Sequence, residues 1–169
     1  VKKLGIKDSD LISYKIHKKS IDSRNKSQVF YVYELDIELK NEDQFRLTPE
    51  QLEASITEKT KVLILPYPNN PTGAIMDRSD LEKIAEIIIK RDLIVLSDEI
   101  YSELSYAGEH TSIASLPGMK ERTILINGFS KSYAMTGWRL GYACGPKEII
   151  EQMIKIHQFA IMCAPTTSQ

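Results

Sequence analysis

Three short, continuously apolar runs constrain the fold of this chain more than any other feature. They are Lys61–Leu65, Leu93–Leu96 and Thr123–Ile126. A strand that is apolar along its whole length is usually covered on both faces, as in parallel sheets. Segments with helical periodicity lie between the runs. The alternation predicts an α/β fold, with a mostly parallel sheet and helices on both faces.

The helical segments carry their own start signals. Thr48 is a predicted N-cap, Pro49 takes the first helical position, and Gln51 completes a capping box. For the next helix, Ser79 is the predicted cap and Glu82 its partner in the box. The buried stripe of that helix is predicted to contain Leu81, Ile84, Ala85 and Ile88.

The C-terminal third continues the same pattern. It predicts a short strand over residues 139–143 and a helix over residues 146–156 that opens with a proline. The start of another helix is predicted over residues 164–169.

The first 43 residues differ in character from the rest. Residues Val29–Leu39 alternate with a period of two, which predicts a half-buried strand. Leu11–Ile16 is a plausible partner, so residues 1–43 are predicted to form a β-hairpin-like module. The basic stretch Ile16–Lys26 is interpreted as a solvated loop. Asn41–Gln44 is the predicted boundary, and residues 44–169 form the second domain.

Composition excludes several classes of function. The net charge of −1 gives no electrostatic case for binding nucleic acid or an anionic membrane. No apolar run approaches membrane-spanning length, and no signal peptide is visible. The two cysteines match no metal-binding spacing, so no metal site is predicted. A cytoplasmic protein is the expectation.

Polar residues follow each of the three apolar runs. Asn69 and Asn70 follow the first, Asp98 and Tyr101 the second, and Ser130 and Lys131 the third, so these six residues form three polar clusters. In open α/β sheets, ligands collect at the carboxyl ends of the strands. The sequence therefore predicts that the three clusters converge on one pocket.

A lysine in such a turn has a specific chemistry. A partly desolvated amine, here that of Lys131, can form a Schiff base with an aldehyde. Arg139 supplies a cation whose fork geometry suits a phosphate. An aldehyde that bears a phosphate suggests pyridoxal 5′-phosphate (PLP). The alternative is a surface turn with a solvated lysine and a salt-bridged arginine.

The remaining polar residues suit the same cofactor. The Asp98 carboxylate could pair with a protonated pyridine nitrogen, which keeps the ring an electron sink. Tyr101 and Asn70 could both donate hydrogen bonds to the phenolic oxygen of the ring. A cis Asn70–Pro71 bond would fix the direction of the Asn70 amide. Alternatively, Asp98 caps the following segment, Tyr101 packs in the core and Asn70 belongs to a plain loop.

Three motifs together resemble one family. They are Pro66-Tyr-Pro-Asn-Asn-Pro-Thr-Gly73, Ser97-Asp-Glu-Ile-Tyr101 and Gly128-Phe-Ser-Lys-Ser-Tyr-Ala-Met-Thr-Gly-Trp-Arg-Leu-Gly-Tyr142. Their order and intervals over residues 44–169 resemble the fold-type-I PLP-dependent aminotransferases of the aspartate/aromatic group. The resemblance implies part of a PLP-binding large domain that transfers an amino group from an amino acid to a 2-oxo acid.

The resemblance also implies a role for each site residue. Lys131 would be the Schiff-base lysine and the carrier of the substrate's proton. Asp98 would pair with the pyridine nitrogen, while Tyr101 and Asn70 would contact the phenolic oxygen. The phosphate would be held by Ser130 and Arg139, and Gly128 stands where many relatives place a phosphate-binding serine.

Two departures from the family lead to further expectations. Family members are longer and homodimeric, and carry a phosphate turn and a substrate-binding arginine beyond the matched part. We therefore expect the 169-residue chain alone to bind PLP weakly and to transaminate little. The segments Ile12–Arg24 and Phe30–Asp36 are similar to the N-terminal module of uncharacterised FAD-dependent dehydrogenases. The alternatives are a non-catalytic remnant that retains the sheet and a PLP-dependent lyase of the same fold.

Overall fold

The computed structural model describes residues 11–22, 30–39, 45–106 and 108–168. The chain divides into two compact units, Val1–Gln44 and Phe45–Gln169, and each is considered by itself. The predicted boundary segment, Asn41–Gln44, lies outside the described residues.

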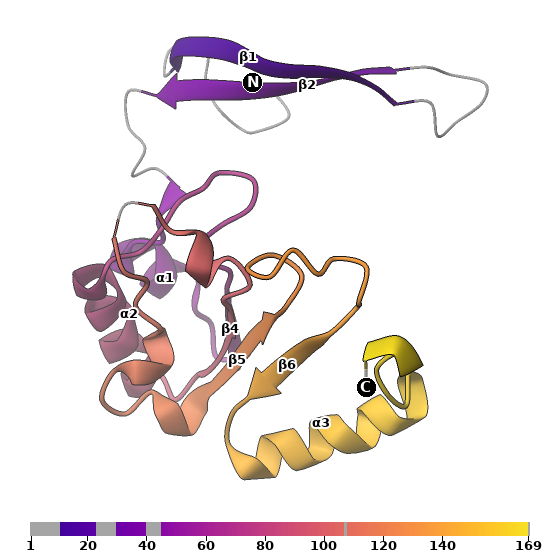
Figure 1. Ribbon diagram of the computed structural model, residues 1–169. Helices are drawn as coiled ribbons and strands as arrows, with labels where there is room; N and C mark the ends of the chain where they lie inside the picture. Colours follow the sequence, from indigo (N-terminus) through magenta and orange to yellow (C-terminus); the bar gives the residue numbers. More distant parts are fainter. Residues whose placement is uncertain (1–10, 23–29, 40–44, 107, 169) are drawn as a thin grey trace. The chain divides into compact units, whose positions relative to one another are not determined.

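The first unit contains the hairpin that the sequence predicts. Strand β1 (Leu11–Asp22) pairs in antiparallel fashion with β2 (Phe30–Leu39), as Figure 1 shows. β1 is longer than predicted, because part of the basic stretch continues the strand. In that extension the ammonium group of Lys19 lies 4.1 Å from the centroid of the Tyr31 ring. The rest of the basic stretch lies outside the described residues.

The second unit is built on a four-stranded sheet in the order β3-β4-β5-β6. Strands β3 (Val62–Leu65), β4 (Ile94–Asp98) and β5 (Thr123–Gly128) run parallel to one another. β6 (Gly141–Cys144) runs antiparallel to β5. The predicted α/β fold with a mostly parallel sheet is confirmed, and the three parallel strands end at the same edge.

The first helix begins where the sequence predicts. Helix α1 (Pro49–Ser55) has Thr48 as its N-cap. The Thr48 side chain accepts a hydrogen bond from the Gln51 backbone at 3.3 Å, and the Gln51 side chain accepts one from the Thr48 backbone at 3.0 Å. This reciprocal pair is the predicted capping box, which satisfies two backbone donors at the helix start.

The predicted cap of the second helix is wrong by two residues. Helix α2 (Arg78–Lys90) has Asp77, and not Ser79, as its N-cap. Asp77 Oδ1 accepts a hydrogen bond from the Asp80 backbone at 3.0 Å and another from the Ser79 hydroxyl at 2.8 Å. The carboxylate takes the cap position because it accepts both bonds, and Ser79 becomes one of its donors.

The core lies between these helices and one face of the sheet (Figure 1). Leu65 of β3 and Val95 of β4 are buried there against the whole predicted stripe of α2. On the opposite side of β3, Val62 and Ile64 are 50% and 65% exposed. Side chains alternate along a strand, so α1 and α2 cover the face of Leu65.

Two adjacent isoleucines of α2 allow a matched test of this core. Ile88 is fully buried, whereas its neighbour Ile89 is 41% exposed. We expect Ile88→Ala to lower the free energy of unfolding by about 2–5 kcal/mol, because it removes buried apolar surface and leaves a cavity. Ile89→Ala is the control and should cost less than half as much. Urea denaturation of both variants measures the difference, and equal losses would contradict the described packing.

The C-terminal part is less covered. Helix α3 (Lys147–Ala160) exposes large apolar side chains, including Ile156 and Phe159. The predicted last helix is a single 3-10 turn, η7 (Thr166–Ser168). Among the described residues no helix has the length and apolarity needed to cross a membrane.

Candidate active site

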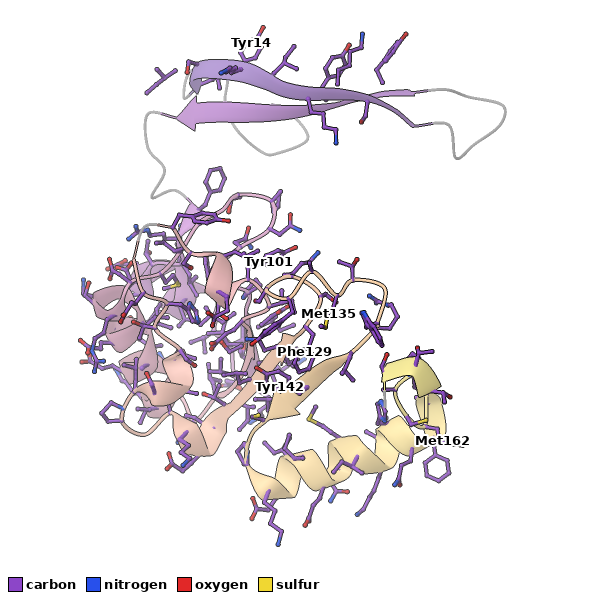
Figure 2. The ribbon with its side chains drawn as sticks, in the orientation of Figure 1. Tyr14, Tyr101, Phe129, Met135, Tyr142 and Met162 are labelled. Carbon is purple, nitrogen blue, oxygen red and sulfur yellow. The ribbon has the colours of Figure 1, made fainter. Side chains whose placement is uncertain are left out.

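Side chains from the ends of all three parallel strands meet at Tyr101 (labelled in Figure 2). Asn70 follows β3, and its Nδ2 donates a hydrogen bond to the Tyr101 hydroxyl at 3.0 Å. Lys131 follows β5, and its Nζ lies 5.4 Å from the centroid of the Tyr101 ring. The structure thus brings one residue from each predicted cluster together at the carboxyl edge of the sheet.

The turn after β3 directs Asn70 toward this edge. The Asn70–Pro71 peptide bond is cis, which the sequence analysis considered as one possibility, and so is the Tyr67–Pro68 bond. The adjacent Asn69 closes the turn: its side chain accepts a bond from the Thr72 hydroxyl at 2.8 Å, and its backbone bonds to Ala74 at 2.9 Å. Asn69 therefore stabilises the turn, whereas Asn70 donates its hydrogen bond to Tyr101.

Asp98 is the last residue of β4 and is half-buried. Its Oδ1 accepts a hydrogen bond from the Ile100 backbone at 3.2 Å. The alternative role considered for Asp98, as a cap of the following segment, is therefore present. No described residue donates a hydrogen bond to Oδ2. One carboxylate oxygen thus stabilises the turn, and the other remains able to accept a bond from a ligand.

Lys131 lies in the loop between β5 and β6. The partial desolvation expected from the sequence is not found, because Lys131 is exposed. The loop is closed by a backbone hydrogen bond from Met135 to Phe129 at 3.3 Å. The Phe129 ring also packs against that of Tyr142 on β6 (Figure 2). The two ring centroids are 5.9 Å apart. These contacts fix the backbone beside the lysine while its amine stays accessible.

The two predicted phosphate ligands lie on the same loop. Ser130 is half-buried, and Arg139 is exposed with a positive φ of 54°. Within the described part of the chain, the Arg139 guanidinium donates its hydrogen bond to the Thr136 carbonyl, at 3.0 Å. The described contacts do not join Ser130 or Arg139 to the group around Tyr101, so their role remains a prediction.

Gly128 has a packing reason of its own. A Cβ atom at this position would lie 3.0 Å from the Leu140 carbonyl oxygen and 3.1 Å from the Gly141 Cα atom. Both are backbone atoms on the β6 side, which no side-chain rotation can move. A serine at 128 would therefore require the two strands to separate.

Sequence reasoning missed a buried carboxylate beside Asp98. Glu99 is only 3% exposed. Its Oε1 accepts hydrogen bonds from the hydroxyls of Ser97 at 2.9 Å and Ser112 at 2.7 Å. Its Oε2 lies 2.8 Å from Nε2 of His110, which must carry the proton because a carboxylate only accepts. The only signal in the sequence was that Glu99 directly follows an apolar strand, where a buried carboxylate needs partners; which residues those partners are could not be read from the pattern.

These partners change the acidity of Glu99. Burial by itself would raise the pKa of this carboxyl group. The hydrogen bonds from His110, Ser112 and Ser97 outweigh burial, and the pKa of Glu99 falls below its ordinary value. Glu99 is therefore ionised at neutral pH in the folded chain.

The lowered pKa predicts how stability depends on pH. A carboxyl whose folded pKa is depressed stabilises the fold above its unfolded pKa of about 4.3, and this contribution is lost as pH falls through the folded value. Glu99→Gln removes the ionisation, so it should cost about 1–3 kcal/mol at pH 7 and clearly less near pH 3. Urea denaturation at both pH values measures this. A cost that does not change with pH would contradict the assigned ionisation.

The donor set at the edge of the sheet fits PLP. Lys131 offers an accessible amine, Asp98 an available carboxylate oxygen, and the Tyr101–Asn70 pair a hydroxyl whose proton can face outward. Among the described residues, no group of three or more His, Cys, Asp or Glu side chains could hold a metal ion. A mostly parallel sheet with this donor set at its carboxyl edge is typical of the class of PLP-binding α/β proteins.

The chain belongs to the aminotransferase class I and II family, whose model matches residues 10–169. The matched range includes both strands of the hairpin. Class I aminotransferases of this family depend on PLP.

Individual relatives agree with this assignment. YugH of Bacillus subtilis (strain 168) is 55% identical over 125 residues, which are 74% of this chain and 32% of that protein. The aspartate aminotransferase of Pyrococcus abyssi (strain GE5 / Orsay) is 48% identical over 80% of this chain and 35% of its own length. The solved aromatic aminotransferase of Pyrococcus horikoshii OT3 superposes with a TM-score of 0.70 and 51% identity, covering 73% of this chain and 33% of that one. The chain thus spans about a third of the length of the relatives it matches.

Proposed function

We propose that this chain is the cofactor-binding part of a PLP-dependent aminotransferase, which moves an amino group between an amino acid and a 2-oxo acid. The observation that supports this most directly is the meeting of Asn70, Tyr101 and Lys131 at the strand ends, beside Asp98. Bound PLP would supply an aldehyde for the lysine and a ring that withdraws electrons from the substrate.

Lys131 would link the cofactor and carry a proton. Its amine is the nucleophile of the cluster, and it lies over the ring of Tyr101. The same amine would also carry a proton at the substrate Cα atom. Asp98 would accept a hydrogen bond from the ring nitrogen through Oδ2 and keep that nitrogen protonated.

Asn70 would orient the Tyr101 hydroxyl. Because the Asn70 amide donates to the hydroxyl oxygen, the proton of that hydroxyl is free to point toward the ligand. Tyr101 would thereby donate to the phenolic oxygen of the cofactor. Ser130 and Arg139 would bind its phosphate, with the Arg139 fork turning away from the Thr136 carbonyl.

The Asn70–Tyr101 contact predicts coupled effects on cofactor binding. Asn70→Ala and Tyr101→Phe should each weaken PLP binding by at least about 5-fold. Asn70→Ala removes the hydrogen bond that orients the Tyr101 hydroxyl, and Tyr101→Phe removes that bond and the proposed bond to the cofactor, each worth about 1 kcal/mol. The double variant should lose less than the sum, because both changes break the same bond. Spectrophotometric titration with PLP measures all three affinities. Strictly additive losses would show that the two side chains act separately.

The wider organisation is also a proposal. Residues 1–43 would be a separate module and residues 44–169 part of the PLP-binding large domain, which the division into two compact units supports. We also propose a cytoplasmic protein that forms a homodimer through the full-length large domain. The relatives named for aspartate and for aromatic amino acids support those two substrate classes.

Incubation with PLP, borohydride reduction and peptide mass spectrometry test the cofactor. We expect a reduced adduct on Lys131, and an adduct spread over surface lysines would contradict the proposal. Steady-state assays of a full-length version with aspartate, aromatic amino acids and alanine against 2-oxoglutarate then test the reaction. Consistent with the sequence-based expectation, we predict little turnover by the 169-residue chain alone.

A further inference from the structure

Glu99 lies beside the candidate site without belonging to it. We propose that Glu99 is a positioning residue, which holds Asp98 and Tyr101 in place by anchoring the end of β4 to the core. The inference rests on the proposed function for the roles of Asp98 and Tyr101. The anchoring itself is a property of this chain and can be measured without cofactor.

Strand geometry separates the two neighbouring carboxylates. Glu99 directly follows β4, and the 2.9 Å hydrogen bond from the Ser97 hydroxyl to its carboxylate places these two side chains on the same side. Asp98 lies next to Ser97 in the strand, so its side chain points to the other side. Ser97 and Glu99 are both 3% exposed, while Asp98 is half-buried. Fixing the Glu99 side chain on the covered side of the sheet therefore sets the direction in which the Asp98 side chain points.

The anchor reaches the core through Ser112. The Ser112 hydroxyl donates to Glu99 at 2.7 Å and accepts a bond from the Ala114 backbone at 3.3 Å, which caps the 3-10 helix η5 (Ile113–Ser115). Ile113 in this helix is 1% exposed and belongs to the main core. Glu99 is thus tied to a segment that cannot move without disturbing the core.

The backbone carries the constraint from Glu99 to Tyr101. The Glu99 amide donates to the Ile126 carbonyl of β5 at 2.9 Å, and the Glu99 carbonyl accepts from the Ser102 amide at 2.9 Å. The Ser102 hydroxyl in turn accepts a bond from the Asn127 side chain at 3.2 Å. Tyr101 sits between these fixed points, so its position depends on them.

Burying a carboxylate costs free energy, so a need for packing alone does not explain a glutamate at this position. An apolar residue could fill the same space, whereas an ionised carboxylate must be matched by donors in fixed directions. Here Ser97, Ser112 and His110 supply those donors from two separate segments. The arrangement favours a role in orientation over a role in filling volume.

Two variants and two controls test the anchor. Glu99→Ala removes it completely, and His110→Ala removes only the partner of Oε2, leaving both serine contacts in place. Glu103→Ala is the matched control, an exposed glutamate four residues further on, and His157→Ala is an exposed histidine on α3. If Glu99→Ala fails to fold, His110→Ala keeps the test decisive.

The first measurement is amide hydrogen exchange of the protein without PLP. Peptides covering residues 98–104 should exchange about tenfold faster in Glu99→Ala, and less markedly faster in His110→Ala. Peptides from α2 should stay within about twofold of wild type, as should all peptides in both controls. Unchanged exchange over residues 98–104 in both variants would overturn the proposal.

The second measurement is the pH midpoint of the visible absorption of bound PLP. It should rise by about one pH unit in Glu99→Ala and stay fixed in Glu103→Ala. The midpoint reports the Schiff-base nitrogen, and a misplaced Asp98 would leave the ring nitrogen without the proton whose positive charge lowers the pKa of that group. Faster exchange with an unmoved midpoint would mean that Glu99 is merely structural, which overturns the positioning role. If wild type forms no PLP adduct at Lys131, the proposed function fails, and hydrogen exchange alone decides whether Glu99 anchors the turn.

Discussion

Replacing Lys131 by alanine is expected to abolish covalent attachment of PLP to this chain. Among the described residues, Lys131 is the amine that lies at Tyr101, 5.4 Å from the ring centroid. Lys131→Arg should have the same effect, because a guanidinium keeps the charge but is not a nucleophile at neutral pH. In a full-length version of the protein, both variants should also lose at least about 10²–10⁴-fold in rate through loss of the proton carrier.

The measurement is mass spectrometry after borohydride reduction, with Lys59→Ala as an exposed-lysine control. The control should retain the wild-type amount of adduct. Retention of the adduct by Lys131→Ala would show that another amine reaches the cofactor, and the assignment of the site would be wrong.

The second large effect is expected at Asp98. Asp98→Asn keeps an oxygen for the Ile100 amide, so the turn after β4 should survive. The negative charge is lost, and the ring nitrogen of bound PLP should then lose its proton. We expect the rate of substrate α-proton exchange in a full-length version of the protein to fall by about 10²-fold or more. This factor is the lower end of the rate losses expected when one charged group of an active site is removed.

Comparison with Asp98→Ala and Asp98→Glu separates the two roles of this side chain. Asp98→Ala should lose the hydrogen bond that closes the turn and should also lower the rate of α-proton exchange. Asp98→Glu should keep the charge and disturb the fold little. Deuterium exchange at the substrate Cα atom, followed by NMR, measures the rate. Equal rates for wild type and Asp98→Asn would mean that Asp98 serves only the local turn.

Features set by neighbours in the sequence were predictable. Thr48, Pro49 and Gln51 form the predicted capping box because its hydrogen bonds join residues three apart. The α2 cap shows the limit of such local reasoning, since Asp77 and Ser79 are both good caps. As a cap, Ser79 would have to accept the Leu81 or Glu82 amide, but its hydroxyl donates to Asp77, which itself accepts the Asp80 amide.

Features set by distant residues were predicted less well. That Asn70 and Tyr101 meet followed from parallel strands ending at one edge, although the residues are 31 positions apart. The exposure of Lys131 did not follow, because desolvation depends on what packs over the amine. Glu99 was missed for a similar reason, since its partners His110 and Ser112 lie in a loop whose path the sequence pattern does not specify.

The close approach of β5 and β6 constrains how this sequence can vary. Gly128 and Gly141 are paired across the two strands, and a Cβ atom on either would lie about 3.0 Å from a backbone oxygen of the other side. A larger residue at one position forces the strands apart and thereby relieves the crowding at the other. The second substitution therefore destabilises the fold less once the first is present. We expect positions 128 and 141 to change together in evolution. We therefore expect a serine at position 128 to require an accompanying change in β6.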